Sequence, residues 1–590
     1  MYDIEAFTLP ELVEKSARDF GSRPFLGMIG KEAVSYAEME ASTRRIAALL
    51  GLYGIGKGDR VALVGESRPE WGLSYLGASR TGAVLVPILN DFMPEQMKNI
   101  IEHAGVKLIF ASRKLQPKIQ AASEGRIVVA IEDLALISGP QGSLDARSPE
   151  GAAALEAALA SWQGFAVAGD DLAAIVYTSG TTGLSKGVML SHRNLVWDAW
   201  SCRGIIVIKP EDRFLSVLPL AHTYEFTIGF VIPLMQGSSV WYLDRPPTAT
   251  ALLPAFAKVK PTCMLTVPLI IEKVYRANVA PTLESMALYK NPLFKPLLER
   301  LAGLKLKKTF GGKMRFYGIG GAPLAEDVER FLRHAKFPYA VGYGLTETSP
   351  MLAGANPSIQ RFRAAGPVLK GCEVRIADPR PDTGEGEIQV RGPNVFSGYY
   401  RDEEKTREAF TEDGWFRTGD LGIIDEKAAV AIRGRSKTMI LGASGENIYP
   451  EEIEAVINAS PHVAESLVYG DKSGLTALIH LKPEVLEELA AKVRAGLEGA
   501  GHAAAGVSHA MSAAGHRASQ AGHAASQAAG DVFHSVEQAA AQLLEAIKKE
   551  ANAKLAAFSR IGRVERQDEP FEKTPKQSIK RFLYPRKRTD

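Results

Sequence analysis

Short apolar runs rich in β-branched residues alternate with amphipathic stretches along the first part of the chain. The amphipathic stretches, such as residues 37–50 and 94–104, have the apolar spacing of surface helices. The apolar runs are RVALVG at 60–65, AVLVPIL at 83–89, KLIFAS at 107–112 and IVVAI at 127–131. Strands that alternate with helices form a largely parallel sheet with helices on both faces. The pattern therefore predicts an α/β fold in which these four runs are buried strands.

The pattern changes twice further along the chain. From about Cys372, short predicted strands are separated by Gly, Pro and Asp turns, which predicts a small antiparallel or barrel-like unit over about residues 365–434. A second α/β pattern begins near Pro450. We therefore predict a large N-terminal domain of residues 1–434, which includes the β-rich subdomain, and a smaller α+β C-terminal domain of residues 435–590.

Residues 499–530 have an unusual composition, with 13 Ala, six Gly, four His and no acidic residue. The histidines recur every seven residues, at His502, His509, His516 and His523. Seven residues are two helical turns, or about 10 Å, so neighbouring histidines of one helix cannot share a metal ion. A stripe of small residues accompanies them and favours close packing of a helix on a partner. We predict an accessory helical insertion at about 497–533 and favour it over a metal-binding histidine ladder.

Charge and cysteine content exclude several classes of protein. The chain has 70 Lys+Arg and 67 Asp+Glu, a formal net charge of +3 that does not favour nucleic-acid binding. Apolar runs stay short of the ~18 residues that span a bilayer, and the first residues do not have the pattern of a signal peptide. The three cysteines lie far apart, which argues against disulfides and Cys-rich zinc sites. We expect a cytoplasmic protein.

The C-terminal residues 572–590 are basic and admit two interpretations. Basic residues attract a protein to an anionic membrane surface, which favours peripheral association with the inner face of the membrane. The same charges suit the phosphates of a bound nucleotide or coenzyme equally well. The basic residues are Lys573, Lys576, Lys580, Arg581, Arg586, Lys587 and Arg588.

Residues 177–187 read YTSGTTGLSKG and follow a predicted apolar strand. Glycines let backbone N–H groups approach an anion, hydroxyl groups donate hydrogen bonds, and Lys186 adds a positive charge. The segment is not a Walker A loop, because Ser185 precedes the lysine and Gly187 follows it. We predict a phosphate-binding loop here and not a flexible surface loop.

Five further motifs follow this loop. They are LPLAHTYEFT at 218–227, GIGGAPL at 318–324, GYGLTETSP at 342–350, GWFRTGDLG at 414–422 and GRSKTMILGASGENIYPEEIE at 434–454. In this order they resemble the adenylate-forming (AMP-binding) superfamily over about residues 8–585, apart from the insertion. Within it, HTYEFTIGFVIPL and SGENIYPEEIE are most similar to bacterial long-chain fatty acid–CoA ligases.

The resemblance implies a two-step reaction with ATP, Mg²⁺ and CoA. A fatty acid, preferably long-chain, is first joined to the α-phosphate of ATP, which expels pyrophosphate. A thiol then displaces AMP and forms the acyl-CoA thioester. Negative charge builds up between a carboxylate and a triphosphate in the first step, so cations and oriented donors are needed to offset it.

The resemblance also assigns roles to individual residues. Thr346 would donate to the α-phosphate, and Glu347 would bind the magnesium ion. Tyr343 would face the adenine, while Asp420 and Arg435 would reach the ribose. Further along the nucleotide, the β- and γ-phosphates would be held by Thr178, Ser179, Gly180, Thr181, Thr182 and Lys186, and the edge of the adenine by Gly320, Gly321 and Ala322.

Three more roles follow from the same resemblance. His222 would lie near the reacting carboxylate, as acid, base or gate. Lys437 occupies the hinge about which the family rotates its small C-terminal domain between the two half-reactions. The segment from Gly445 to Asn447 would then line the thiol tunnel.

The C-terminal lysine of the family is replaced in this chain. The family pattern PKTxSGKIxR corresponds to EKTPKQSIKR at 572–581, which puts Ser578 where the adenylation lysine belongs. Lys576 and Lys580 lie two residues away on the same face of an extended segment. We favour Lys576 as the substitute, with Lys580 and a slow adenylation step as the alternatives.

The acyl chain is expected to meet a channel without side chains. We predict that glycines keep this channel open and that apolar residues near His222 line it, although the glycines would serve turns equally well. The glycines are Gly318, Gly320, Gly342 and Gly344, and the predicted lining residues are Phe226, Ile228, Phe230 and Val231. Acyl transfer to a carrier-protein thiol and a non-catalytic acyl- or nucleotide-binding protein remain alternative functions, whereas no feature favours a luciferase-like oxygenase.

Overall fold

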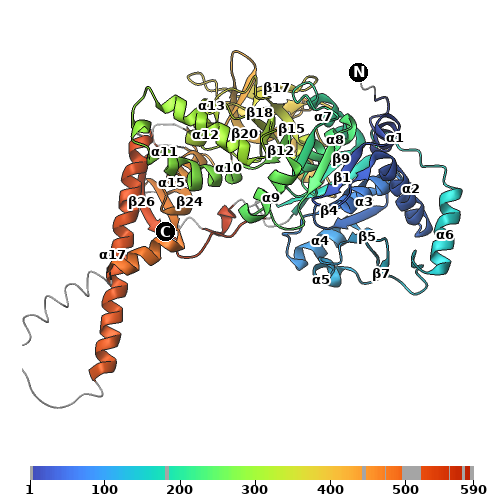
Figure 1. The fold of residues 1–590 in the computed structure, drawn as a ribbon, viewed down its shortest axis with the longest axis horizontal. Coiled ribbons are helices and arrows are strands. Elements are labelled where there is room, and N and C mark those ends of the chain that lie inside the picture. The colour runs from blue at the N-terminus through green and yellow to red at the C-terminus, as the bar shows by residue number, and fades with distance from the viewer. Residues whose placement is uncertain are drawn as a thin grey trace, which may run out of the picture. The chain divides into compact units, whose positions relative to one another are not determined.

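The structure is a computed structural model that describes residues 4–179, 185–436, 438–441, 447–471, 474–493, 520–556, 559–574 and 579–584. Within these ranges the side chains of 179, 185, 441, 447, 471, 520–535 and 582 are not described. The chain divides into two compact units, Met1–Arg433 and Gly434–Asp590. Each unit is described by itself below (Figure 1).

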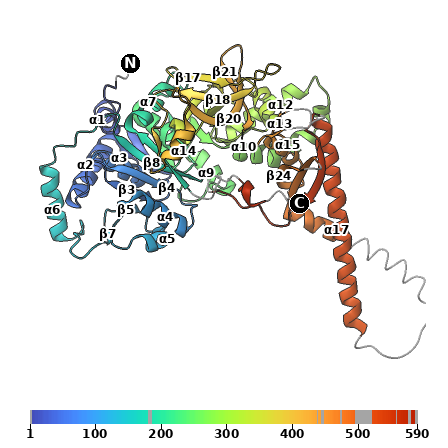
Figure 2. The same ribbon diagram turned by 180° about the vertical axis from the view of Figure 1, so that it is seen from behind.

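The first extended sheet of the N-terminal unit contains the four predicted strands. Its strand order is β19-β9-β8-β4-β3-β5-β6-β7, with parallel pairing from β8 through β6 and antiparallel strands at both edges. Figure 2 shows β3, β4 and β8 side by side with α3 and α4 next to them. The bounds are β3 (Arg60–Val64), β4 (Val84–Ile88), β5 (Val106–Ala111), β6 (Ile127–Ala130), β7 (Leu136–Ser138), β8 (Leu172–Ser179), β9 (Ser185–Ser191) and β19 (Gly398–Tyr399). The predicted α/β class is confirmed.

A second extended sheet has the order β15-β14-β13-β12-β10-β11-β1-β2. Its inner strands are parallel, and only the edge strands β2 and β15 run antiparallel to their neighbours. The carboxyl ends of parallel strands lie at one edge of a sheet, where ligands bind in open α/β folds. The bounds are β1 (Pro24–Met28), β2 (Val34–Ser35), β10 (Arg213–Ser216), β11 (Ser239–Tyr242), β12 (Cys263–Thr266), β13 (Phe316–Ile319), β14 (Tyr339–Gly344) and β15 (Met351–Gly354).

Helices cover both sheets, and several begin with side chains that cap them. Ser35 and Glu38 form a capping box at the start of α2, and Ser191 and Asn194 form one at α7. The bounds are α1 (Leu9–Phe20), α2 (Tyr36–Leu52), α3 (Pro69–Ser79), α4 (Pro94–Ala104), α5 (Gln116–Ile119), η1 (Gln120–Ala122), α6 (Pro149–Ala160), α7 (His192–Cys202), the π-helix η2 (Glu225–Val231), α8 (Ile232–Gln236), α9 (Ala249–Val259), α10 (Pro268–Val274), the π-helix η3 (Tyr275–Val279), α11 (Ala280–Glu284), η4 (Ala287–Lys290), α12 (Lys295–Thr309), α13 (Glu326–His334) and η5 (Thr346–Thr348).

The β-rich segment forms a separate antiparallel sheet. Its order is β16-β21-β20-β18-β17, and α14 (Glu403–Ala409) lies between two of its strands in the sequence. The two-residue strand β19 comes from the same segment but pairs with β9 of the first sheet, which fastens the two sheets together. The bounds are β16 (Gly366–Pro367), β17 (Glu373–Ala377), β18 (Gly386–Arg391), β20 (Phe416–Ile424) and β21 (Ala429–Arg435).

The C-terminal unit has a mixed sheet of order β24-β25-β26 covered by α15 and α17. Ion pairs of Lys573 with Glu465 and of Arg581 with Glu454 fasten its last described segment to this sheet and to α15. The bounds are β22 (Ile440–Leu441), β23 (Asn447–Ile448), α15 (Pro450–Asn458), β24 (Val463–Asp471), β25 (Gly474–Leu481), a helix at 483–493, α17 (Gln520–Lys554), β26 (Ile561–Arg566) and η7 (Arg581–Leu583).

Only the end of the predicted insertion belongs to the described residues. From Gln520 onward the chain is part of α17, and the first three histidines of the repeat lie outside the described ranges. His523 is helical, but its side chain is not described. Among the described helices, none is long and apolar enough to cross a membrane.

Candidate active site

Two neighbouring parallel strands of the second sheet bring several predicted nucleotide-binding residues to one edge. β13 and β14 pair in register through Ile319 and Val341. The segment from Gly320 to Ala322 follows β13 directly, and Tyr343 lies near the end of β14. Gly321 has a φ of 85°, a left-handed conformation that favours glycine. The strands therefore place these residues where the fold offers a ligand-binding edge.

Tyr343 and Asp420 are in direct contact. The Tyr343 hydroxyl donates a 2.7 Å hydrogen bond to Asp420 Oδ2. Asp420 lies in β20 and is buried, so this bond joins the edge of the second sheet to the β-rich sheet. The Tyr343 ring and the Asp420 carboxylate are therefore neighbours. A flat ring can stack on a base, and a carboxylate can accept hydrogen bonds from the hydroxyl groups of a sugar.

Lys186, Tyr399 and Glu347 form a second group. Tyr399 Oη donates to Glu347 Oε1 at 3.0 Å, and Lys186 Nζ lies 4.7 Å from the centroid of the Tyr399 ring. The pairing of β19 with β9 brings Tyr399 to this position, and the backbone N–H of Phe396 donates to the Glu347 carbonyl. Sequence reasoning missed Tyr399, because a two-residue strand leaves no periodic signal.

The segment that follows Thr346 is held by one buried amide. Asn394 Nδ2 donates to the carbonyl oxygens of Thr348 at 3.0 Å and Met351 at 2.6 Å, and Asn394 Oδ1 accepts from the Cys372 thiol. Asn394 Nδ2 also lies 3.3 Å from Asp198 Oδ1. Burial raises the pKa of Asp198 well above its usual range. Sequence reasoning missed Asn394 as well.

His222 precedes the π-helix η2, and Glu225 is the first residue of that helix. The backbone N–H of Tyr224 donates to His222 Nδ1 at 3.2 Å, so the neutral ring carries its proton on Nε2. Glu225 is fully buried, and burial raises its pKa to about 8. The carboxyl group is therefore mainly protonated at neutral pH, which spares the interior an uncompensated charge.

A narrow apolar cavity lies between η2 and the strands β12 to β15. Its free volume of about 10 Å³ is no more than one water molecule needs. Met351 also contributes to the wall, and its side chain lies 3.2 Å from where a Cβ on Gly342 would be. The lining residues are Ile206, Tyr224, Ile228, Leu265, Phe316, Gly318, Ile319, Ala340, Val341, Gly342, Met351, Gly354 and Ala355.

This cavity contains some of the residues predicted to form an acyl channel, and the channel itself stays a prediction. Of the four predicted apolar lining residues only Ile228 lines it. Phe226 and Phe230 are buried in an aromatic cluster instead, in which the ring centroids of Phe226 and Tyr75 are 4.2 Å apart. Gly318 and Gly342 do line the cavity. Gly344 has a different function, since a Cβ there would lie 1.7 Å from the Pro350 carbonyl oxygen and close backbone packing requires the glycine.

The remaining predicted residues are only partly described. Thr178 pairs with Lys186 across the β8–β9 ladder, so the two described ends of the predicted phosphate loop are neighbours. Arg435 is the exposed last residue of β21. Several predicted residues lie outside the described ranges or have no described side chain, namely Ser179, Gly180, Thr181, Thr182, Lys437, the 445–447 segment, Lys576 and Ser578.

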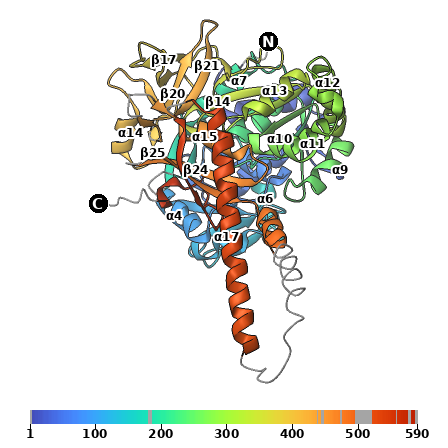
Figure 3. The same ribbon diagram turned by 90° about the vertical axis from the view of Figure 1, so that its left-hand side faces the viewer.

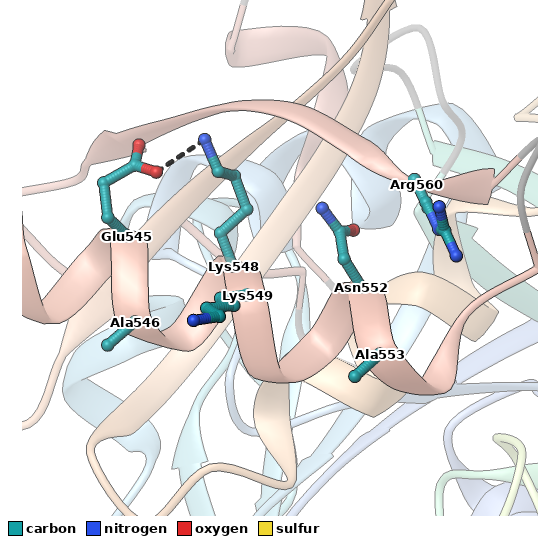
Figure 4. A pocket seen from close by; sticks show the side chains of 7 residues that line it. All are labelled: Glu545, Ala546, Lys548, Lys549, Asn552, Ala553 and Arg560. Carbon is teal, nitrogen blue, oxygen red and sulfur yellow. Dashed lines mark ion pairs between the residues drawn. The ribbon is translucent and has the colours of Figure 1, made fainter.

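The C-terminal unit has an open hollow of its own, shown in Figure 4. It lies between the end of α17 and Arg560, and an ion pair of 2.6 Å joins Lys548 to Glu545 on its wall. Asn552 donates to and accepts from the backbone of Ile561, which closes one side. None of its lining residues is among the predicted site residues, so we assign it no part in the chemistry.

Comparisons with known proteins show the family of this chain. The family model described as AMP-binding enzyme matches residues 13–400. The chain is 33% identical to the long-chain-fatty-acid–CoA ligase FadD15 of Mycobacterium bovis over 76% of this chain and 77% of that protein. It is 32% identical to long chain acyl-CoA synthetase 6, peroxisomal, of Arabidopsis thaliana, over 82% and 74%. The crystal structure of ATP-bound MatB from Rhodopseudomonas palustris matches 98% of both chains with a TM-score of 0.68 and 26% identity.

The Asn394 amide is predicted to be necessary for stability. Asn394→Ala leaves the carbonyl oxygens of Thr348 and Met351 buried without their donor, which we expect to lower the free energy of unfolding by about 3 kcal/mol. The matched control is Asn356→Ala, which removes a less buried amide that also bonds to the backbone, at a cost of about 1 kcal/mol. Urea unfolding measures both values, and equal losses in the two variants would contradict the role assigned to Asn394.

Proposed function

Because the chain belongs to the AMP-binding enzyme family, we propose that it activates a fatty acid with ATP and transfers it to CoA. The first step forms an acyl-adenylate and releases pyrophosphate, and the second forms the thioester and releases AMP. The contact between Tyr343 and Asp420 supports this proposal most directly, because it joins a ring for adenine to a carboxylate for the ribose hydroxyls. The names of the relatives described above favour a long-chain acid as substrate and CoA as acceptor.

The second group of residues suits a triphosphate with its magnesium ion. Lys186 supplies a positive charge, Thr346 a hydroxyl donor and Glu347 a carboxylate of the type that Mg²⁺ prefers. Tyr399 contacts both Lys186 and Glu347 and so sets the separation between these opposite charges. Glu347 would hold the magnesium ion, which would supply positive charge to offset that of the phosphates. In the proposed reaction Thr346 donates to the α-phosphate and Lys186 binds the outer phosphates.

The acyl group is proposed to enter the apolar cavity beside Gly318 and Gly342. We assign His222 to the neighbourhood of the reacting carboxylate, and its Nε2 is the atom that carries an exchangeable proton in the neutral ring. Lys437 is proposed as the hinge for the second half-reaction. We also propose a cytoplasmic location with peripheral contact to the membrane.

The product of the reaction tests the function. The protein is incubated with ATP, Mg²⁺, CoA and fatty acids of two to twenty carbons, and the products are identified by mass spectrometry. We expect acyl-adenylate without CoA and acyl-CoA with it, with the largest yield for the long acids. Reactions without ATP are the control. If no acid gives a product while the protein still binds nucleotide, it is a non-catalytic member of its family.

The magnesium ligand is tested by Glu347→Gln. An amide oxygen binds a hard cation more weakly than a carboxylate, so half-maximal activity should require about 10-fold more Mg²⁺ or higher. Tyr399→Phe is the matched control, because it removes the hydrogen bond to Glu347 and leaves the carboxylate and the ring beneath Lys186 in place. We expect a change of less than about 3-fold in the control, in line with the small net value of one hydrogen bond. An unshifted Mg²⁺ requirement in Glu347→Gln would disprove the assignment.

The substitute for the C-terminal lysine is proposed to be Lys576. The neighbouring lysines are engaged elsewhere, since Lys580 Nζ pairs with Glu572 at 3.1 Å and Lys573 pairs with Glu465. The replacement of this lysine by Ser578 is also what favours a non-catalytic protein as the second candidate function.

ATP–pyrophosphate exchange in three variants tests this assignment. We expect Lys576→Ala to slow exchange by at least about 10-fold, since a charged hydrogen bond to the reacting phosphate is lost, and Lys580→Ala to have little effect. The thioester step from preformed acyl-adenylate should stay intact in both. If neither alanine variant slows exchange while Ser578→Lys raises it strongly, then no lysine replaces the missing one.

A further inference from the structure

Helix α12 and the turn before it expose a row of large apolar side chains. Leu297, Leu301 and Leu304 are 56%, 53% and 60% exposed and follow one another at i, i+4 and i+7 on one side of the helix. Leu293 and Phe294 continue the row into the preceding turn, and Leu293 is 85% exposed. We call these five residues the α12 face. Figure 3 shows α12 in the N-terminal unit beside α10, α11 and α13.

The opposite side of α12 packs against the rest of the N-terminal unit. This packing fixes the orientation of the helix and therefore the exposure of these leucines. Glu299, Gly303 and Leu306 are buried. The Glu299 carboxylate accepts from the Tyr289 hydroxyl at 3.0 Å and pairs with His334 at 2.8 Å. A Cβ on Gly303 would lie 2.4 Å from the Ala335 carbonyl oxygen, so the helix packs directly on the end of α13.

Within residues 285–313 the exposed charges of α12 and its flanking turns have one sign, and the exposed Glu284 just precedes this segment. Residues 285–313 contain a single acidic residue, Glu299, which is buried beneath the helix. Arg300, Lys305 and Lys308 are exposed and lie among the leucines. The basic residues of this segment are Lys290, Lys295, Arg300, Lys305, Lys307, Lys308 and Lys313.

We propose that the α12 face docks on an anionic lipid surface. A fixed helix with leucines on one side and flanking Lys and Arg residues has the composition of an interfacial helix, whose apolar side chains enter the boundary between headgroups and acyl chains. The basic residues then meet the lipid phosphates. Charge decides against a second copy of this chain as the occupant, because a symmetric contact would bring two basic faces together.

The core beneath the docked helix reaches the apolar cavity at one buried residue, Ile319. Leu306 of α12 and the following Phe310 pack in one core with Tyr317 and Ile319 of β13, and Ile319 lines the cavity. The helix proposed to contact the membrane thus shares a core with one strand of the cavity wall, β13. The contact itself requires no catalysis and is measured without ATP.

Vesicle binding by the full chain tests the leucines. Sucrose-loaded vesicles of phosphatidylcholine, alone or with one quarter phosphatidylglycerol, are sedimented with the wild-type protein and with Leu297→Ser/Leu301→Ser/Leu304→Ser. We expect binding to the anionic vesicles that falls at least about 10-fold in the triple variant, because three apolar side chains no longer enter the interface. The matched control is Leu52→Ser/Val207→Ser/Ile359→Ser, which removes three other exposed apolar side chains and should bind like wild type. All three proteins should unfold at similar temperatures.

A charge variant tests the basic residues. Arg300→Gln/Lys305→Gln/Lys308→Gln should bind the anionic vesicles about 100-fold more weakly, at roughly 5-fold for each charge near the surface, and should bind neutral vesicles as wild type does.

Several results would overturn the proposal. They are wild-type protein that binds neither vesicle, a leucine variant that binds like wild type, and binding that is lost only when residues 586–590 are deleted, which would make the C-terminal tail the anchor. A wild-type dimer in light scattering that the leucine variant dissociates, without vesicle binding, would identify a second copy as the occupant.

Discussion

Buried polar groups need hydrogen-bond partners, because no water reaches them. The side-chain amide of Asn394 is the partner of several such groups. Its side chain bonds to backbone on both sides of the Ser349–Pro350 peptide and lies beside Asp198 of α7. The Ser349 hydroxyl also donates a hydrogen bond to the backbone carbonyl oxygen of Asn394. The segment that presents Thr346 and Glu347 is thus fixed by interior hydrogen bonds, which are expensive to break because no water can replace them. The backbone of Thr346 and Glu347 is therefore adjacent to a hydrogen-bonded, buried segment.

Tyr399 lies beside two charged side chains of the candidate site, Lys186 and Glu347. Lys186 and Glu347 carry opposite charges and share Tyr399 as a neutral neighbour. The ring of Tyr399 lies against Lys186 and its hydroxyl bonds to Glu347, so one neutral side chain is a partner for both. In the reaction proposed above, the positive charge and the carboxylate would each act on a different part of a phosphate–metal complex.

The sequence predicted the elements whose signals are local and missed those that depend on distant pairing. The four apolar runs at 60–131 became β3 to β6, because a buried strand is apolar along its whole length. Tyr399 depends on the pairing of a two-residue strand with β9, more than two hundred residues earlier, and Asn394 on contacts with α7 and β15. Apolar composition alone could not separate Ile228, which lines the cavity, from Phe226, which packs against Tyr75.

The wall of the apolar cavity combines a fixed backbone with a pliable side chain. The backbone N–H of Met351 donates to Asp198, and its carbonyl oxygen accepts from Asn394. Its thioether, in contrast, reaches into the cavity beside Gly342 and Gly354. A methionine has three rotatable side-chain bonds and adapts its shape at low cost. The cavity can therefore widen by a rotamer change without displacing the neighbouring turn. For the proposed acyl site, this means that the cavity can change its shape while the turn that carries Thr346 and Glu347 keeps its position.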